Sequence, residues 1–180
     1  LLRDALALED ENSTAGVWFQ LGRHYMARGD YDGAADAAKQ GLDQTPHPDS
    51  DLLSYYAEAL LNAERFEEAL AVADEMTVPP YQALVRAVVA FKRQQPEVAL
   101  EYFEASQRFW PENPVSRYYA ARSAEQIGDF DRAIEEYRYA LRSAPTKTDA
   151  GLRLARIFRA QGEDDEANHV LVHVIQEAEN

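Results

Sequence analysis

Two histidines and two glutamates near the end of the sequence have a spacing that could bind a metal ion. His169 and His173 are four residues apart, so on a helix their imidazoles point the same way, and Glu166 and Glu177 extend that face. Imidazole and carboxylate groups together suit a divalent cation. However, no third ligand comes from another segment, and nothing in the sequence would exclude water. We therefore interpret these residues as a solvated helix face and expect no metal and no cofactor.

Other catalytic groups are missing from the sequence. The absence of cysteine excludes thiol catalysis and cysteine-based zinc sites. No glycine loop has the spacing of a phosphate-binding loop, and no serine has the strand-turn-helix context of a nucleophile. Carboxylates are abundant, but they are spread along predicted helices and none forms an isolated acid–base pair. We therefore predict that the chain is not an enzyme and has no catalytic residues.

Arginines near the end of the sequence form a cluster that needs compensating negative charge. Arg153, Arg156 and Arg159 follow one another at intervals of three, along one face of a helix. Like charges at this spacing repel one another by roughly 0.2–0.5 kcal/mol per pair. Nearby carboxylates such as Asp149 or Glu125 could offset the repulsion, and so could a bound anion. Both explanations stay open at this point.

Aromatic rings accompany arginines at two further places. Tyr118 and Tyr119 precede Arg122, and Phe19 precedes Arg23. Rings beside guanidinium groups suit a peptide with carboxylates and apolar side chains, because arginine offers paired hydrogen bonds and rings offer contact area. The two tyrosines could equally pack between helices. The predicted peptide-binding residues are Phe19, Arg23, Tyr118, Tyr119, Arg122, Arg153, Arg156 and Arg159.

A repeated turn indicates which elements position these side chains. The motif GDYDGA begins at Gly29, GDFDRA at Gly128 and GEDDEA at Gly162, the last two 34 residues apart. A copy without glycine begins at Glu64, and a more divergent copy begins at Gln95. Each turn separates two apolar patterns of helical period, which predicts a helix, a tight turn and a second helix. Glycine can end the first helix in a left-handed conformation, and the acidic residue after it can cap the second.

The first complete copy carries a recognisable signature. Trp18, Leu21, Gly22 and Tyr25, the turn from Gly29, Ala34 and Pro46 together resemble the tetratricopeptide repeat. The resemblance implies an all-α fold, a right-handed superhelical α–α solenoid of five tetratricopeptide helix-turn-helix units that binds other proteins. We predict units at 15–49, 50–80, 81–113, 114–147 and 148–180, with 1–14 as the end of a preceding repeat's helix.

Small residues mark the predicted crossing points of the helices, where close backbones leave no room for large side chains. They are Gly22, Ala57, Ala121 and Ala155 on first helices and Ala34, Ala69, Ala99, Ala133 and Ala167 on second helices. In the third unit we place Leu84, Ala87, Val88 and Phe91 in the core. A shift of one residue would bury Arg86, at a cost of several kcal/mol for an unpaired guanidinium.

The resemblance also implies that first helices line a concave surface. Fourteen-residue windows for the five first helices hold ten basic and four acidic residues, a net charge of +6, whereas the remainder carries −20. We therefore expect a basic concave groove that binds an acidic or C-terminal peptide segment of another protein. The subgroup of this family that clamps a chaperone's terminal carboxylate has Lys and Asn where this chain has Phe19 and Arg23. The chain is thus not predicted to belong to it.

Overall charge and hydropathy exclude several other partners. A net charge of −14 and a pI near 4.6 oppose binding to nucleic acid. No apolar stretch reaches the roughly 20 residues of a membrane-spanning helix. The two ends lack polar capping helices, which favours a piece of a longer protein, or ends that pack on a partner or on a second copy as a homo-oligomer. Alternative functions are a regulatory or substrate-presenting arm of a larger enzyme and a structural assembly module. The sequence does not indicate a compartment.

Overall fold

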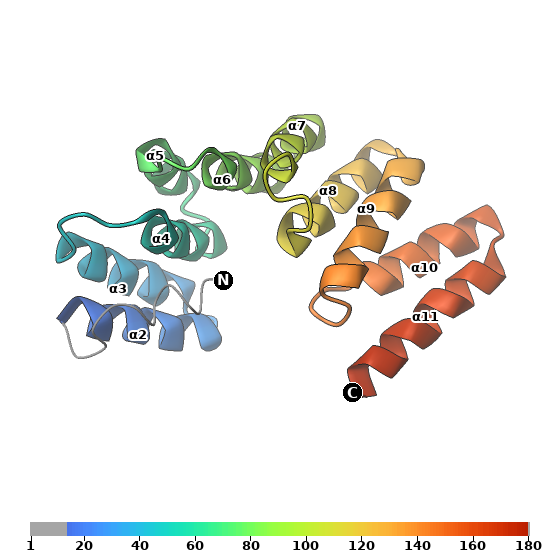
Figure 1. Cartoon of the computed structure of the whole chain (residues 1–180), viewed down its shortest axis with the longest axis horizontal. Helices are drawn as coiled ribbons and strands as arrows, with labels where there is room; N and C mark the ends of the chain where they lie inside the picture. Colours follow the sequence, from blue (N-terminus) through green and yellow to red (C-terminus); the bar gives the residue numbers. More distant parts are fainter. Residues whose placement is uncertain (1–13, 180) are drawn as a thin grey trace. The chain divides into compact units, whose positions relative to one another are not determined.

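The computed structural model describes residues 14–179, which form ten α-helices and no strand (Figure 1). The helices are α2 (Thr14–Ala27), α3 (Tyr31–Asp43), α4 (Ser50–Asn62), α5 (Phe66–Glu75), α6 (Pro79–Lys92), α7 (Pro96–Gln107), α8 (Pro114–Ile127), α9 (Phe130–Ser143), α10 (Ala150–Gln161) and α11 (Asp164–Glu179). None of these ten is long and apolar enough to cross a membrane. The protein is therefore an all-α helical repeat solenoid, as the sequence predicts.

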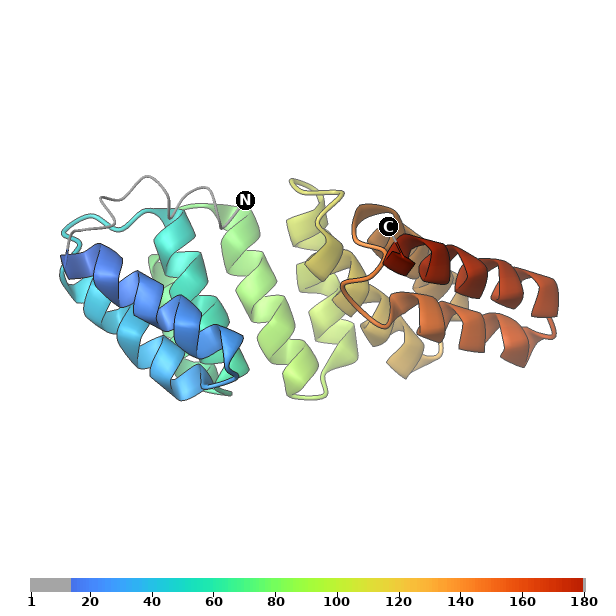
Figure 2. The same ribbon diagram turned by 90° about the horizontal axis from the view of Figure 1, so that it is seen from below.

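The chain divides into two compact units at the Val89–Ala90 boundary, inside α6. Within each unit, consecutive helices lie side by side as antiparallel pairs, for example α2 with α3 and α10 with α11 (Figure 2). The helices alternate with turns as in the predicted helix-turn-helix units, although α2 begins at Thr14 and α6 at Pro79, just before the predicted starts at 15 and 81. The boundaries of the five units remain predictions. The predicted helix of residues 1–14 lies outside the described residues, except for Thr14.

The turns within the pairs use the backbone conformation predicted for them. Gly29, Gly128 and Gly162 have φ of 74°, 79° and 81°, in the left-handed region that glycine adopts without steric cost. In the two copies without glycine, Glu64 and Gln94 take the same conformation, each with φ of 59°. The geometry of the turn is thus kept even where the residue best suited to it has been replaced.

Aspartates after two of these glycines cap the second helix of the pair. Asp30 Oδ1 accepts a hydrogen bond of 3.0 Å from the Gly33 amide, and Asp129 Oδ1 accepts one of 3.2 Å from the Arg132 amide. Each bond satisfies one of the free amides at the start of a helix. The same short motif therefore ends one helix and starts the next.

Small residues occupy the crossing points between helices. All nine residues of the predicted small column are buried, namely Gly22, Ala34, Ala57, Ala69, Ala99, Ala121, Ala133, Ala155 and Ala167. Two further glycines serve the same purpose. A Cβ atom at Gly41 would lie 2.9 Å from the ring of Phe19, and one at Gly151 would overlap the side chain of Val174. Neither position has room for a larger residue while its neighbour stays in place.

Helix α6 has the register that the sequence favours. Ala87, Val88 and Phe91 are buried and Leu84 is partly buried, whereas Arg86 Nη2 donates a hydrogen bond of 2.6 Å to Asp74 Oδ1. This guanidinium is therefore paired and partly exposed rather than enclosed among apolar side chains.

A buried ion pair ties three helices of the second unit together. Arg117 on α8 and Glu136 on α9 have side chains only 13% and 8% exposed, and Arg117 Nη1 donates to both carboxylate oxygens at 2.9 and 3.0 Å. Arg117 Nε donates to the Pro111 carbonyl, and Gln107 Nε2 at the end of α7 donates to Glu136 at 3.2 Å. Burial raises the pKa of Glu136 above its usual range, and the bonds from Arg117 only partly oppose that shift.

Removing one partner of this pair should be costly. We expect Arg117→Met to lower the free energy of unfolding by about 3–5 kcal/mol, because the Glu136 carboxylate would remain buried without its counter-ion. Urea denaturation followed by circular dichroism measures the change. The matched control is Arg108→Met, at an exposed position at the end of α7, which should shift stability by less than about 0.5 kcal/mol. Equal effects of the two substitutions would contradict a structural role for the pair.

Candidate functional site

The predicted peptide-binding residues fall into both units. Phe19 and Arg23 lie on α2 in the first unit, and the other six lie on α8 and α10 in the second. Phe19 is only 1% exposed, packs against Gly41, and meets the ring of Tyr55 edge-on at a centroid distance of 6.2 Å. It is therefore a core residue, and we do not retain the prediction that it contacts a peptide. Arg23 is partly exposed, and its role remains a prediction.

Helices α8 and α10 present adjoining stripes of side chains in the second unit. Val115, Tyr118 and Arg122 follow at helical spacing on α8, and Leu152, Arg156 and Arg159 do so on α10; we term these six residues the α8–α10 face. Asp149, at the start of the α10 stripe, accepts a hydrogen bond of 2.6 Å from the Tyr118 hydroxyl. This bond fixes the two stripes beside each other.

Arg153 is compensated inside the protein. Its Nε donates to both oxygens of Asp149 at 2.9 and 3.1 Å, and its Nη1 donates to Glu125 Oε2 at 3.2 Å. The Tyr137 hydroxyl donates to the same Glu125 oxygen at 2.7 Å. The sequence left two explanations open for the arginine cluster, nearby carboxylates or a bound anion. For Arg153, the nearby carboxylates offset the charge.

The same contacts shift the pKa of the groups involved. Burial acts to raise the pKa of Asp149, but hydrogen bonds from Tyr118 and Arg153 outweigh it and hold that pKa below its usual range. For Tyr137, burial and the bond to Glu125 both raise the pKa of the phenol. Asp149 is thus ionised and Tyr137 protonated over a wide range of pH, which keeps the network charged in one fixed pattern.

Tyr119 and Arg122 pack against aromatic rings from neighbouring helices. Tyr119 lies between Phe91, at a centroid distance of 5.1 Å, and Phe103, whose stacked ring is 6.2 Å away. Tyr119 is partly exposed, and its ring packs these neighbouring helices together. The Arg122 guanidinium lies 4.9 Å from the centroid of Phe91 and 5.8 Å from that of Tyr118. These rings hold the cation in place without neutralising it.

Three cations of the α8–α10 face have no carboxylate partner within the described part of the chain. Arg122 is partly exposed, and Arg156 and Arg159 are exposed, yet none of them forms an ion pair with residues 14–179. Two aliphatic side chains lie in the same stripes with about half of their surface exposed, Val115 at 47% and Leu152 at 52%. The face can therefore offer charge-assisted hydrogen bonds and apolar contact to the same ligand.

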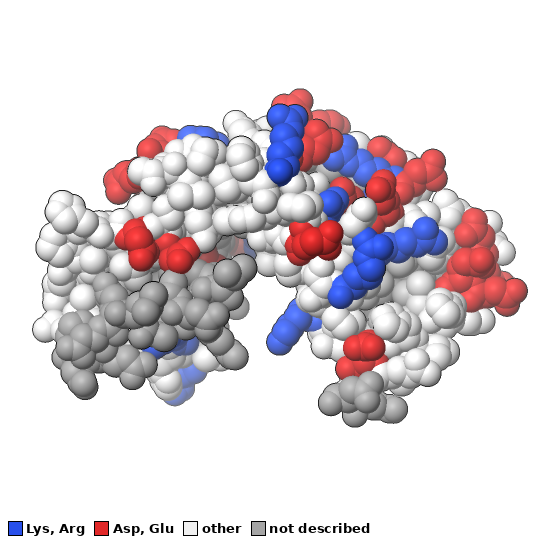
Figure 3. All heavy atoms as spheres, in the orientation of Figure 1, with Lys and Arg blue, Asp and Glu red and all other residues white. Residues whose placement is uncertain are grey.

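Not every first-helix cation belongs to such a face. Arg86 and Arg117 pair with Asp74 and Glu136, which both lie on second helices. In the second unit, Figure 3 shows basic and acidic side chains side by side over α7, α8 and α9. The net charges of +6 for the first helices and −20 for the remainder therefore overstate how far basic and acidic side chains are separated in space. The reason is that an arginine side chain is long enough to reach the neighbouring helix.

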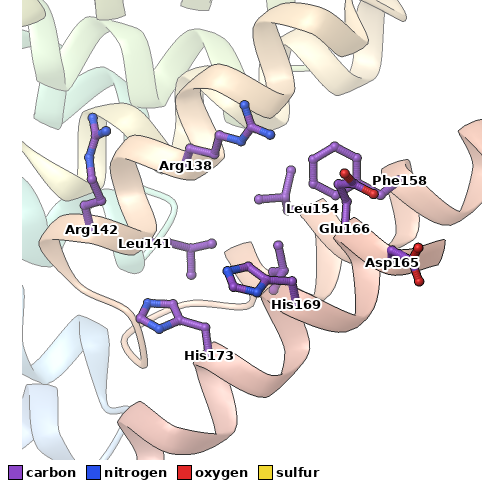
Figure 4. A pocket seen from close by; sticks show the side chains of 10 residues that line it. Arg138, Leu141, Arg142, Leu154, Phe158, Asp165, Glu166, His169 and His173 are labelled. Carbon is purple, nitrogen blue, oxygen red and sulfur yellow. The ribbon is translucent and has the colours of Figure 1, made fainter. Parts of the chain in front are cut away.

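The two C-terminal histidines border a hollow that the sequence does not reveal. His169 and His173 line a pocket of about 610 Å³ with residues of α9 and α10 (Figure 4). Among residues 14–179, no three His, Asp or Glu side chains are close enough together to bind a metal ion. Helical spacing places the two histidines on one face, but Leu141, Leu154 and Phe158 beside them belong to α9 and α10, 11 to 32 residues earlier in the sequence.

Comparisons with known proteins identify the repeats. A model of the tetratricopeptide repeat matches residues 19–82, and a second model of the same repeat matches residues 124–180. No curated protein matches the chain in sequence.

Several solved structures share the fold. TTC0263, a thermophilic TPR protein from Thermus thermophilus, matches with a TM-score of 0.73 and 19% identity over 93% of each chain. MamA 41-end from Desulfovibrio magneticus RS-1 matches with a TM-score of 0.63 and 17% identity over 90% of this chain and 93% of its own. A further MamA structure matches with a TM-score of 0.64 and 18% identity over 88% and 95%. At these identities the likeness concerns the fold.

Asp149 should make the stability of the second unit depend on pH. Because its pKa is lower in the folded than in the unfolded chain, its contribution is present above the unfolded value of about 3.9 and is lost as pH falls through the folded value. We expect Asp149→Asn to lower the free energy of unfolding by about 1–2 kcal/mol at pH 7 and by less near pH 3. Urea denaturation at both pH values measures this. Asp131→Asn, an exposed residue on α9, is the control, and a deficit of Asp149→Asn that persists unchanged at low pH would contradict the assignment.

Proposed function

Because the chain belongs to the tetratricopeptide repeat family, whose members act as protein-interaction scaffolds, we propose that its α8–α10 face binds an acidic segment of a partner protein, without catalysis. The observation that carries the proposal is the presence of three arginines without carboxylate partners among the described residues, beside two half-exposed aliphatic side chains. A carboxylate ligand would neutralise these cations, and its apolar side chains would cover Val115 and Leu152.

Within this face the arginines have different roles. Arg122 is held against two rings, so little of its conformational freedom remains to be lost on binding, and Arg156 and Arg159 supply further charge one helical turn apart. Arg153 positions Asp149 and Glu125 rather than contacting the ligand. An internal acidic segment or a chain's C-terminal carboxylate would both satisfy this arrangement.

Charge reversal at Arg122 and Arg156 tests the proposal. We expect Arg122→Glu with Arg156→Glu to weaken binding of acidic, leucine-containing peptides from an immobilised array at least about tenfold, because attraction becomes repulsion at two positions. Each peptide is presented with a free and with an amidated C-terminus, which separates terminal from internal recognition.

The control combines Arg108→Glu with Lys147→Glu, which changes the net charge equally at two exposed positions that are not among the six residues of the face. Circular dichroism confirms that both double variants remain folded. Arg153 is not reversed, since a carboxylate there would lie beside Asp149 and Glu125 and would destabilise the unit. Equal peptide binding by the two double variants would sink the proposal.

Self-association is a second candidate function. Val172 and Ile175 on α11 are 52% and 57% exposed and lie three residues apart, on one side of the helix. A second copy packed on this side would bury both. We expect light scattering to show a dimer that dissociates in Val172→Glu with Ile175→Glu; a monomer at all concentrations of the unmodified chain would exclude this candidate.

A further inference from the structure

One side of α7 exposes large apolar side chains. Val98, Tyr102 and Phe109 are 42%, 37% and 63% exposed and follow one another at intervals of four and seven residues, along the helix and into the turn after it. We term these three residues the α7 stripe. After the first residue of each helix, the exposed positions of α3, α5 and α9 hold only charged, polar or small side chains. The other second helices thus show that the repeat does not require such a stripe, and α7 differs from them for another reason.

Two carboxylates flank the α7 stripe. Glu97 and Glu101 lie one helical turn apart on α7, and both are exposed; we term them the acidic pair. Neither forms an ion pair with any residue of 14–179. Arg108 lies two helical turns beyond Glu101, so the negative charge is confined to the first half of the helix. This side of α7 therefore combines apolar side chains with negative charge that is not compensated within the described residues.

This side of α7 is the chemical complement of the α8–α10 face. The face has three arginines without carboxylate partners among residues 14–179 and two half-exposed aliphatic side chains. Arg156 and Arg159 lie one helical turn apart, as Glu97 and Glu101 do, so the Cβ atoms of either pair are about 5–6 Å apart. Two carboxylates at this spacing can bind two guanidiniums while the α7 stripe covers the aliphatic side chains.

One molecule cannot bring the two surfaces together. The opposite side of α7 packs on α8, where the buried ring of Phe103 stacks on Tyr119 at a centroid distance of 6.2 Å. The α7 stripe therefore points away from α8. The α8–α10 face lies where Tyr118 is bonded to Asp149 of α10, and α7 and α10 lie on different sides of α8 (Figure 1). Because packing fixes both surfaces, the α7 stripe can reach an α8–α10 face only on a second molecule.

We propose that the α7 stripe and the acidic pair of one molecule dock on the α8–α10 face of a second copy of the chain. The inference rests on the proposed function, because it names the acidic partner of that face. The two surfaces differ, so each oligomer keeps one free surface of each kind and further copies can add. The net charge of −14 makes copies repel one another, but at about 0.15 M salt this repulsion is screened beyond about 8 Å, whereas close ion pairs remain.

Charge reversal on either surface tests the contact by analytical ultracentrifugation of the full chain. We expect oligomers that grow with concentration between about 10 μM and 1 mM, because two short stripes form a small interface. Arg122→Glu with Arg156→Glu, or Glu97→Arg with Glu101→Arg, should weaken association at least about tenfold, because attraction becomes repulsion. A mixture of these two double variants should associate again, and so should one chain with all four substitutions, since opposite charges then face each other.

A matched control lies on α9. Asp131→Arg with Glu135→Arg makes the same charge change at the same spacing, at two exposed positions that begin in the first turn of the helix, and should leave association unchanged. All chains carry Val172→Glu with Ile175→Glu, so that any contact through α11 is removed. Circular dichroism confirms that each variant is folded.

Three results would overturn the proposal. The first is a monomer up to about 1 mM. If acidic peptides still bind the α8–α10 face of that monomer, the proposed function stands and only this inference fails; a basic, leucine-containing peptide bound to the α7 stripe would then assign the stripe to another protein. The second is association that the reversal on α7 does not weaken, because another part of the chain would then occupy the face. The third is failure of both the mixture and the fourfold variant to associate.

Discussion

Close approach of helix backbones is the constraint on which the rest of this structure depends. Alanine or glycine at each crossing leaves room for the backbone of the neighbouring helix, and Gly151 shows how little tolerance remains, because any Cβ there would meet Val174. Each pair alone would leave an apolar side uncovered, so each packs on the next. That stacking decides which sides of α8 and α10 stay exposed, and therefore which arginines can meet a ligand.

The arginines of the second unit divide into two groups according to the carboxylates within reach. Arg117 and Arg153 end beside Glu136 and Asp149, where the ion pairs connect neighbouring helices. Both charges lose their hydration on burial, so such a pair adds little net stability. Removing one partner is nevertheless costly, because the other charge then stays buried without a counter-ion. Arg122 packs against rings and forms no ion pair with the described residues, although its charge helps to lower the pKa of Asp149. Position relative to the next helix, rather than residue type, thus separates a structural arginine from one that can bind.

The fold could be predicted from the sequence because its determinants are local. The turn motif fixes where helices end, and Glu64 and Gln94 show the same backbone conformation where glycine is absent. The small residues at crossings follow a fixed spacing and could be identified by position. In α6, the cost of burying Arg86 favours one register, and in the structure that arginine is bonded to Asp74.

The site was less predictable because its properties arise between helices. Phe19 precedes Arg23 by one helical turn, which suggested a shared exposed stripe, but its ring fills the space left by Gly41. The sequence names Asp149 and Glu125 as carboxylates that could offset the arginine cluster, but only the packing of the helices shows that both of them bind Arg153. The hollow beside His169 has the same origin, since its floor combines side chains of three helices.

Helix α10 gives the second unit two faces of different character. Leu154 and Phe158 point toward α9 and α11, while Leu152, Arg156 and Arg159 form the stripe beside α8. Between them Ala155 is buried, so the helix is fixed by packing and neither side can rotate toward the other. The two sets of side chains do not overlap, and α10 is the rigid element between them.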